Sequence, residues 1–152
     1  MMVRFTPAEH KHIADIVALL ADDPLGKTRE NTSAEMLPRY MQAFENIEKD
    51  PNNKLIAIME EEHVIGCLQL TFIPYLTHMG STRCLIEGVR IHPDYRGQAI
   101  GKKAFEWAIF YAKTKGCHMV QLTCDKSRHK AKKFYENLGF IASHEGMKLH
   151  LS

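Results

Sequence analysis

The chain has 152 residues, of which 45% are apolar and 25% are charged, with a net charge of +2 at neutral pH. That length and apolar fraction are typical of one globular domain with a sizeable core, so we expect a single domain over residues 1–152. So mild a charge argues against a dedicated nucleic-acid-binding protein, whose domains are usually strongly basic on one face. No apolar run approaches the ~20 residues of a membrane span, and the N-terminus lacks a signal-peptide core. We therefore expect a cytoplasmic protein with neither nucleic acid nor membrane as partner.

Cysteine spacing gives no sign of a metal site or a disulfide framework. The four cysteines form no C-x-x-C pair, so the sequence predicts reduced thiols and no metal. They are Cys67, Cys84, Cys117 and Cys124.

The first half of the chain predicts a strand, two helices and a hairpin. Two capping boxes, Thr6-Pro7-Ala8-Glu9 and Thr32-Ser33-Ala34-Glu35, each predict a helix start. Alternating apolar residues on both sides of a tight acidic turn predict the hairpin. In chain order we expect a strand at 2–5, a helix from 6 to about 20, a polar turn at 22–31, a second helix from 32, and strands at 54–60 and 63–72.

The second half alternates predicted strands and helices. Glycines at positions 116 and 139 are expected to end two of its helices. In chain order we expect a loop at 74–82, a strand at 83–91, a helix at 100–115, a strand at 119–124, a short helix over 131–138, and a closing hairpin of strands 140–142 and 147–151.

The most informative stretch joins the strand that contains Val89 and Ile91 to the helix that begins near Ile100. Proline at position 93 ends the strand because proline cannot donate to a ladder. The residues between offer free backbone N–H groups at the positive end of a helix dipole, where an anion is favoured. The spacing of Gly97 and Gly101 fits neither G-x-x-x-x-G-K-[ST] nor G-x-G-x-x-G, which argues against a nucleotide kinase and a dinucleotide enzyme.

This turn, Arg96-Gly97-Gln98-Ala99-Ile100-Gly101, resembles the pyrophosphate loop of the GNAT superfamily of acyl-CoA N-acyltransferases, [RQ]-x-x-G-x-[GA]. Ala99 replaces the central glycine, and we expect it to keep helical backbone angles and a usable N–H. About thirty residues later, Ala131 to Phe140 are similar to the family's A-x-x-[FL]-Y-x-x-x-G-F element. Arg128 stands where the family usually has asparagine.

The resemblance implies an α/β fold with a mixed, mostly antiparallel central sheet of about seven strands and about four flanking helices, splayed at the acetyl-CoA site. Gly88 agrees with the bulge that the family has in the strand next to the cofactor. Backbone groups of Val89 and Ile91 would then bind the pantetheine. The implied cofactor-binding residues are Val89, Arg90, Ile91, Arg96, Gly97, Gln98, Ala99, Ile100, Gly101, Lys102, Ala131 and Phe134.

Members of this family transfer an acetyl group from acetyl-CoA to an amine, so the resemblance implies an N-acetyltransferase with acetyl-CoA as co-substrate. A lysine-like amine has a pKa near ~10.4 and must lose a proton before it attacks. Glu87 is the candidate base, and in a regular strand it shares a face with Val89 and Ile91. A solvated strand residue is the alternative for Glu87, and His78, His144 or water are other candidate bases.

Tyr135 is the candidate acid that protonates the leaving thiolate, because the family's tyrosine in this element usually does so. The alternative is a core residue, since Tyr135 shares an apolar stripe with Ala131 and Leu138. A cysteine acyl-enzyme through Cys84 or Cys124 is less favoured than direct attack, because neither cysteine has an evident activating base.

The acceptor is expected to be a small-molecule amine. The stretch from Cys124 to the end is faintly similar to bacterial small-amine acetyltransferases, such as those that act on aminoalkylphosphonates. A protein or peptide amine and a non-catalytic CoA-binding module are the alternatives. The resemblance also makes a homodimer a candidate assembly.

Overall fold

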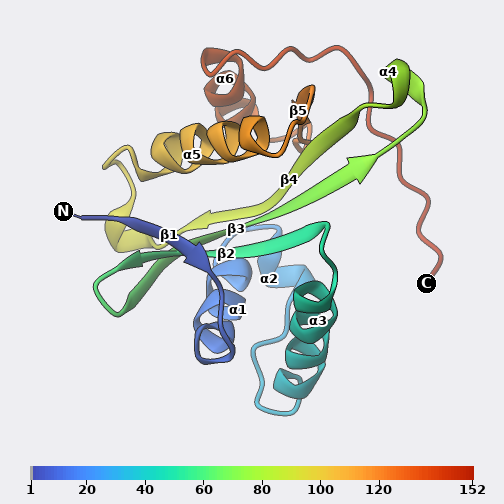
Figure 1. Ribbon diagram of the computed structural model, residues 1–152. Coiled ribbons are helices and arrows are strands. Elements are labelled where there is room, and N and C mark those ends of the chain that lie inside the picture. The colour runs from blue at the N-terminus through green and yellow to red at the C-terminus, as the bar shows by residue number, and fades with distance from the viewer. Residues whose placement is uncertain (1) are drawn as a thin grey trace.

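The computed structural model describes residues 2–152, in which helices flank both faces of one sheet (Figure 1). The strands are β1 (Arg4–Pro7), β2 (Asn53–Glu60), β3 (His63–Pro74), β4 (Thr82–Ile91) and β5 (Met119–Gln121). The α-helices are α1 (Ile13–Ala21), α2 (Gly26–Arg29), α3 (Leu37–Lys49), α4 (Thr77–Gly80), α5 (Ile100–Thr114) and α6 (His129–Asn137). The 3-10 helices η1 (His10–His12) and η2 (Pro93–Tyr95) complete the elements of the described residues.

The strands lie in the order β1-β2-β3-β4-β5, so each strand pairs with its neighbours along the chain. β1 to β4 pair antiparallel, and β5 pairs parallel to β4 after the crossover through α5. The predicted mixed, mostly antiparallel sheet is confirmed. The predicted number of elements is wrong, because residues 2–152 contain five strands and six α-helices in place of about seven and four.

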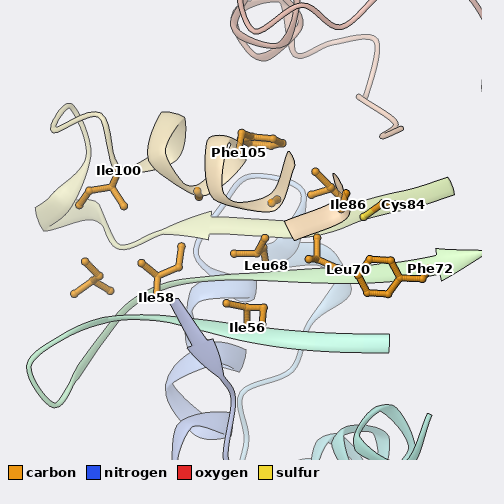
Figure 2. Packing of buried hydrophobic residues seen from close by; sticks show 13 residues of the cluster. Ile56, Ile58, Leu68, Leu70, Phe72, Cys84, Ile86, Ile100 and Phe105 are labelled. Atoms are coloured by element: carbon orange, nitrogen blue, oxygen red, sulfur yellow. The ribbon is translucent and has the colours of Figure 1, made fainter. Parts of the chain in front are cut away.

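A hydrophobic cluster on each face of the sheet joins the layers. On one face, Phe105 of α5 packs with Leu68 and Ile86, which point toward that helix (Figure 2). On the other face, Phe44 of α3 belongs to a cluster that includes Cys67. Neighbouring strand residues point to opposite faces, so β3 is buried on both sides and forms the centre of the fold. None of the helices within residues 2–152 combines the length and the apolar character that a membrane span requires.

β4 carries a one-residue bulge against β3. The register pairs Gln69 with Glu87 and Cys67 with Arg90, so three steps along β4 match two steps along β3. Gly88 lies inside this bulge with φ +59°, a left-handed conformation that glycine adopts without a steric penalty. The bulge expected at Gly88 is therefore confirmed.

The bulge changes the face on which Glu87 lies. Glu87 shares a sheet face with Arg90, because their partners on β3 are two residues apart. Val89 and Ile91 pack instead against the cluster under α5. The expectation that Glu87 faces the same way as Val89 and Ile91 is wrong, because it assumed a regular strand.

β4 and β5 are paired over a short ladder and then separate. Their ladder covers only Arg83–Leu85 and Met119–Gln121, after which β4 continues to Ile91 without a partner on that side. The predicted strand 119–124 thus ends at Gln121. The separation of the two strands leaves the bulged part of β4 beside an opening in the sheet.

Element boundaries in the first half of the chain differ from the prediction. β1 continues to Pro7, which pairs with Ile56, so the first helical turn begins only at His10. The predicted turn at 22–31 contains α2, the predicted loop at 74–82 contains α4, and the second helix begins at Leu37 instead of residue 32. Strand pairing outweighs the local capping signal at the first of these positions.

The C-terminal tail, residues 141–152, leaves the sheet. The predicted closing hairpin of residues 140–142 and 147–151 is wrong, since neither segment pairs in a ladder within residues 2–152. Every residue of the tail is exposed, and Figure 1 shows it running from α6 to an end clear of the rest of the fold. A strand needs a neighbour for its N–H and C=O groups, and the tail has none among the described residues.

Candidate functional site

The turn between β4 and α5 presents a row of backbone N–H groups. Lys103 N donates to Ala99 O at 3.1 Å, which is the first bond of the helix. The N–H groups of residues 97–102 have no acceptor among the described residues. Gly97 has φ +78°, and a Cβ placed on it would meet nothing within 4 Å. The turn therefore has the geometry expected of an anion site at the N-terminal end of a 15-residue helix.

A cavity of about 320 Å³ lies over this turn. Phe134 of α6 forms one wall and lies close to the turn, because a Cβ on Gly101 would be 3.8 Å from its Cζ. The volume falls in the range of small-molecule sites. The lining residues are Ile91, Tyr95, Arg96, Gly97, Ala99, Ile100, Gly101, Lys102 and Phe134.

Eight of these nine residues are among the predicted cofactor-binding residues, and Tyr95 was missed. Its position in η2, beside the turn, gave no motif by which it could be found. Val89, Arg90, Gln98 and Ala131 do not line the cavity.

Ala99 is strained. Its φ of +62° and ψ of +18° are left-handed, so the expectation of helical backbone angles at this position is wrong. A side chain makes this conformation less favourable by about 1–2 kcal/mol, which explains why glycine is usual here in the family that the motif resembles. The strain lies in a turn whose N–H groups have no acceptor among the described residues.

Arg96 supports the turn through its side chain. Its Nε donates to Ile91 O at 3.2 Å, and its guanidinium lies 3.5 Å from Asp22 O and 3.9 Å from Asp22 Oδ2. The side chain thus joins the turn to the C-terminal end of α1.

Arg90 forms a more buried ion pair with the neighbouring carboxylate. Its guanidinium lies 2.7 Å from Asp23 Oδ2, with side-chain exposures of 13% and 10%. Asp23 Oδ1 also accepts from the N–H groups of Leu25 and Gly26 at 2.7 and 3.1 Å. Burial opposes ionisation of Asp23, but these N–H groups and Arg90 outweigh it and lower the pKa of the carboxyl. The side chain of Arg90, a predicted cofactor-binding residue, therefore binds the segment between α1 and α2. Asp23 lies in no sequence motif.

Tyr135 lies on α6 between the cavity and the loop that follows β5. Its ring packs against Phe105 at a centroid distance of 5.3 Å. Burial raises the pKa of Tyr135, nearby Cys124 raises it further, and Arg128 and Arg90 oppose the shift. The phenol is therefore protonated at neutral pH and can donate. Tyr135 is therefore a packing residue whose pKa also responds to Cys124, Arg128 and Arg90.

Glu87 is exposed on the face of the sheet that carries Arg90 and Asp23. None of the ion pairs within residues 2–152 involves it, so its carboxylate is available to a ligand.

The two histidines considered as bases lie elsewhere. His78 is in α4 at the tip of the β3–β4 hairpin, with its ring 5.1 Å from that of His118. His144 lies in the tail beside Ser143, whose Oγ is 2.7 Å from its Nδ1.

Comparison with known proteins agrees with the motifs. The sequence model of the Acetyltransferase (GNAT) family matches residues 15–140. A glucosamine 6-phosphate N-acetyltransferase of Trypanosoma brucei brucei is 35% identical over 58% of this chain and 58% of its own length. An aminoalkylphosphonate N-acetyltransferase of Salmonella typhimurium is 30% identical over 62% of this chain and 61% of its own length. The match thus spans less than two thirds of either curated relative.

A solved structure follows nearly the whole chain. The crystal structure of a protein named as a transcriptional regulator of Bacillus halodurans C-125 has 49% sequence identity and a TM-score of 0.95. It covers 99% of this chain and 100% of its own, so the superposition includes nearly all of the C-terminal tail.

The strain at Ala99 predicts a stabilising substitution. Ala99→Gly should increase the free energy of unfolding by about 0.5–1 kcal/mol, because the loss of the left-handed penalty exceeds the entropy of an added glycine. Urea unfolding without ligand measures the change. Gly97→Ala, which creates the same strain at a position where a Cβ meets nothing within 4 Å, should destabilise by a similar amount. If neither variant changed the free energy of unfolding, the left-handed conformation assigned to Gly97 and Ala99 would be contradicted.

The Arg90–Asp23 pair predicts a pH-dependent contribution to stability. Since the pKa of Asp23 is lower in the folded chain than its ordinary value of 3.8, ionised Asp23 stabilises the fold above that pH, and this is lost as the pH falls towards the folded pKa. Asp23→Asn should cost about 2 kcal/mol at pH 7, and this cost should shrink progressively as the pH falls below 3.8.

Asp22→Asn is the matched control, because its ion pair with Arg96 is longer and half exposed. It should cost less than about 0.5 kcal/mol at either pH. Equal effects of the two variants in urea unfolding would refute the assignment of the buried pair.

Proposed function

Because this chain belongs to the acetyltransferase (GNAT) family, we propose that it transfers the acetyl group of acetyl-CoA to the primary amine of a small molecule that carries a phosphate or phosphonate. The cavity over residues 97–102, with its outward N–H groups, is the observation that carries the proposal. The two curated relatives named above act on amines with a phosphate or phosphonate group, which supports this acceptor class.

The turn fits the diphosphate of CoA. Consecutive N–H groups at a helix N-terminus hydrogen-bond phosphate oxygens, and Gly97 and Gly101 place no side chain in the way. Lys102 and Arg96 line the same cavity and would add positive charge. When bound, acetyl-CoA would supply a thioester as the acyl donor.

Glu87 would take the proton from the acceptor amine. Its face of the sheet is the one that carries the Arg90–Asp23 pair, opposite the cluster under α5. The acceptor would therefore approach from the side of α1 and α2. Arg128, whose charge influences the pKa of both Tyr135 and Asp23, is a cation suited to the anionic group of the acceptor.

Tyr135 would give its phenolic proton to the sulfur that leaves. Direct attack by the amine forms the amide bond as the carbon–sulfur bond breaks, and the two protons move through Glu87 and Tyr135. A route through Cys84 is disfavoured because burial raises the pKa of its thiol to about 12, with a smaller contribution from Cys117.

A second candidate is a regulatory protein that binds acetyl-CoA without turnover. The name of the Bacillus halodurans relative favours it. Binding of acetyl-CoA is common to both candidates, and acetylation of an amine separates them.

Acetyl-CoA should stabilise the protein against unfolding because it would bind to the turn at residues 96–101. At about 100 times its dissociation constant the ligand adds about 2.7 kcal/mol, which raises Tm by roughly 5–10 °C in a chain of this size. Gly97→Asp should abolish the shift, because a carboxylate would oppose the diphosphate. Calorimetry with and without acetyl-CoA measures both.

Gly116→Asp is the control, since Gly116 has a similar φ of +76° and equally open surroundings at the far end of α5. It should keep the full shift. If acetyl-CoA still raised the Tm of the Gly97→Asp protein, the turn at residues 96–101 would not be part of the acetyl-CoA site.

Glu87→Gln and Tyr135→Phe should each reduce kcat by about 10²-fold or more while the shift with acetyl-CoA persists, because proton transfer contributes 10²–10⁴-fold. Turnover is followed as thiol release with glucosamine 6-phosphate and an aminoalkylphosphonate, beside the same amines without the phosphorus group. We expect kcat/KM to favour the anionic amines by about tenfold or more, as one charge-assisted pair supplies about 1.5–3 kcal/mol.

Glu62→Gln and Tyr111→Phe serve as matched controls, because neither residue belongs to β4 or α6, the elements that carry Glu87 and Tyr135, and both variants should leave turnover unchanged. Normal turnover in Glu87→Gln or Tyr135→Phe would refute the assigned role of that residue. Binding of acetyl-CoA without acetylation of any amine would favour the second candidate.

A further inference from the structure

β3 places two polar residues on the face of the sheet opposite α5. Leu68 and Leu70 point toward α5 (Figure 2), so Gln69 and Thr71 lie on the other face. Cys67, the preceding residue on that face, is buried, whereas Gln69 and Thr71 are half-buried. Burial of a polar side chain is costly unless it is hydrogen-bonded, so both side chains require partners.

Asn53 of β2 is a partner of both side chains. Gln69 Nε2 donates to Asn53 Oδ1 at 3.2 Å, and Thr71 Oγ1 donates to the same oxygen at 2.8 Å. Asn53 Nδ2 in turn donates to Asp50 Oδ2 at 2.8 Å. Because a carboxylate only accepts, Asp50 fixes which end of the Asn53 amide faces β3. The Gln69 amide is therefore oriented as well, with its nitrogen toward Asn53.

The oxygen of the Gln69 amide is left as a free acceptor. The bond to Asn53 is the only hydrogen bond of the Gln69 side chain within residues 2–152, and Oε1 is not fully buried. Gln69 lies directly opposite Glu87 in the β3–β4 ladder. Opposite side chains in an antiparallel pair have Cβ atoms about 4.5–5.5 Å apart. Two free acceptors, the Glu87 carboxylate and the Gln69 amide oxygen, are therefore neighbours on this face.

The cations of β4 on the same face do not occupy these acceptors. The guanidinium of Arg90 lies 2.7 Å from Asp23 Oδ2. The guanidinium of Arg83 lies over the ring of Tyr75, 4.5 Å from its centroid. Within residues 2–152, neither arginine donates to the pair of acceptors. The pair is thus available to a donor from outside the chain.

Given the proposed function, on which this inference rests, we propose that Gln69 Oε1 and the Glu87 carboxylate together bind the ammonium group of the acceptor. An ammonium group has three donors and no acceptor, which matches two acceptors side by side. A hydroxyl group has a single donor, so it can satisfy only one of them. Gln69 is therefore a residue that selects an amine over the corresponding alcohol.

The same arrangement prepares the amine for attack. One proton passes from the ammonium nitrogen to the Glu87 carboxylate, and the neutral amine keeps two N–H groups and gains a lone pair. One N–H stays on Gln69 Oε1, which holds the nitrogen in place. Asn53 acts through Gln69 as a positioning residue, because without it the amide is free to turn its nitrogen toward the ammonium group.

Binding of paired probes tests this ammonium subsite without turnover. Glucosamine 6-phosphate and glucose 6-phosphate differ only in an ammonium and a hydroxyl group, as do aminoethylphosphonate and hydroxyethylphosphonate. Calorimetric titration of the full-length protein with CoA present gives a dissociation constant for each probe. The wild type should bind the amine of a pair about tenfold or more tightly than the alcohol, because hydrogen bonds to charged groups are the stronger ones.

Two variants of Gln69 isolate the chemistry of its oxygen. Gln69→Leu should lower the ratio of the amine affinity to the alcohol affinity by about tenfold, because one acceptor is lost. Gln69→Glu keeps an acceptor at the same place and should retain the preference for the amine. Both variants change a half-buried side chain, and urea unfolding confirms that each is folded.

Thr71→Val is the matched control, because it removes the other hydrogen bond to Asn53 Oδ1 at a residue opposite Leu85 instead of Glu87. It should change the ratio by less than about twofold. Asn53→Ala should lower the ratio by about threefold, and it should have no further effect when combined with Gln69→Leu, since a positioning residue acts only through its partner.

A wild type that binds neither amine more tightly than its alcohol would overturn the proposal. A Gln69→Leu protein that keeps the wild-type ratio would do the same. Acetylation is measured separately. Amine-selective binding that depends on Gln69, without acetylation of any amine, would refute the proposed function and leave the subsite standing. Acetylation of an amine with a ratio that Gln69→Leu does not change would refute the subsite and leave the function standing.

Discussion

The bulge at Gly88 is the constraint from which the site follows. One extra residue in β4 sends Glu87 and Arg90 to one face of the sheet and Val89 and Ile91 to the other. The proposed acceptor side and the proposed cofactor side would thereby be separated by a single strand. The same stretch of β4 has no partner on its β5 side, which leaves an opening where the two sides meet.

Two consecutive acids connect this strand to the other half of the molecule. Asp22 and Asp23 end α1 and bind Arg96 of the turn and Arg90 of β4. The longer pair is half exposed and adds little to stability, whereas the buried pair holds the segment between α1 and α2 against β4. The segment between α1 and α2, which would line the acceptor side, is therefore positioned by β4, the strand that leads into the turn proposed to bind the cofactor.

Local signals predicted most of the residues that line the cavity over the turn. A turn of small residues between a β-branched strand and a helix sets its own geometry, so eight residues of the cavity could be identified from one motif and one later helix. The backbone of Ala99 shows the limit of such local prediction. Its left-handed conformation is imposed by the turn, although alanine itself prefers a right-handed one. The pairing of Asp23 with Arg90 could not be found, since the two residues are far apart in the chain, and Tyr95 lies next to the turn but outside its motif.

The sequence by itself determined the order of the longer strands and helices up to residue 138, the bulge, and the turn that presents its N–H groups, because each depends on neighbours within a few residues. Only the tertiary structure decided the face of Glu87, the pairing of Arg90 with Asp23, and the fate of the last strand. Residues 147–151 have the alternation of a strand, yet a ladder requires a second chain segment beside it. Whether that segment lies in the same molecule is a property of the whole fold, which no local pattern contains.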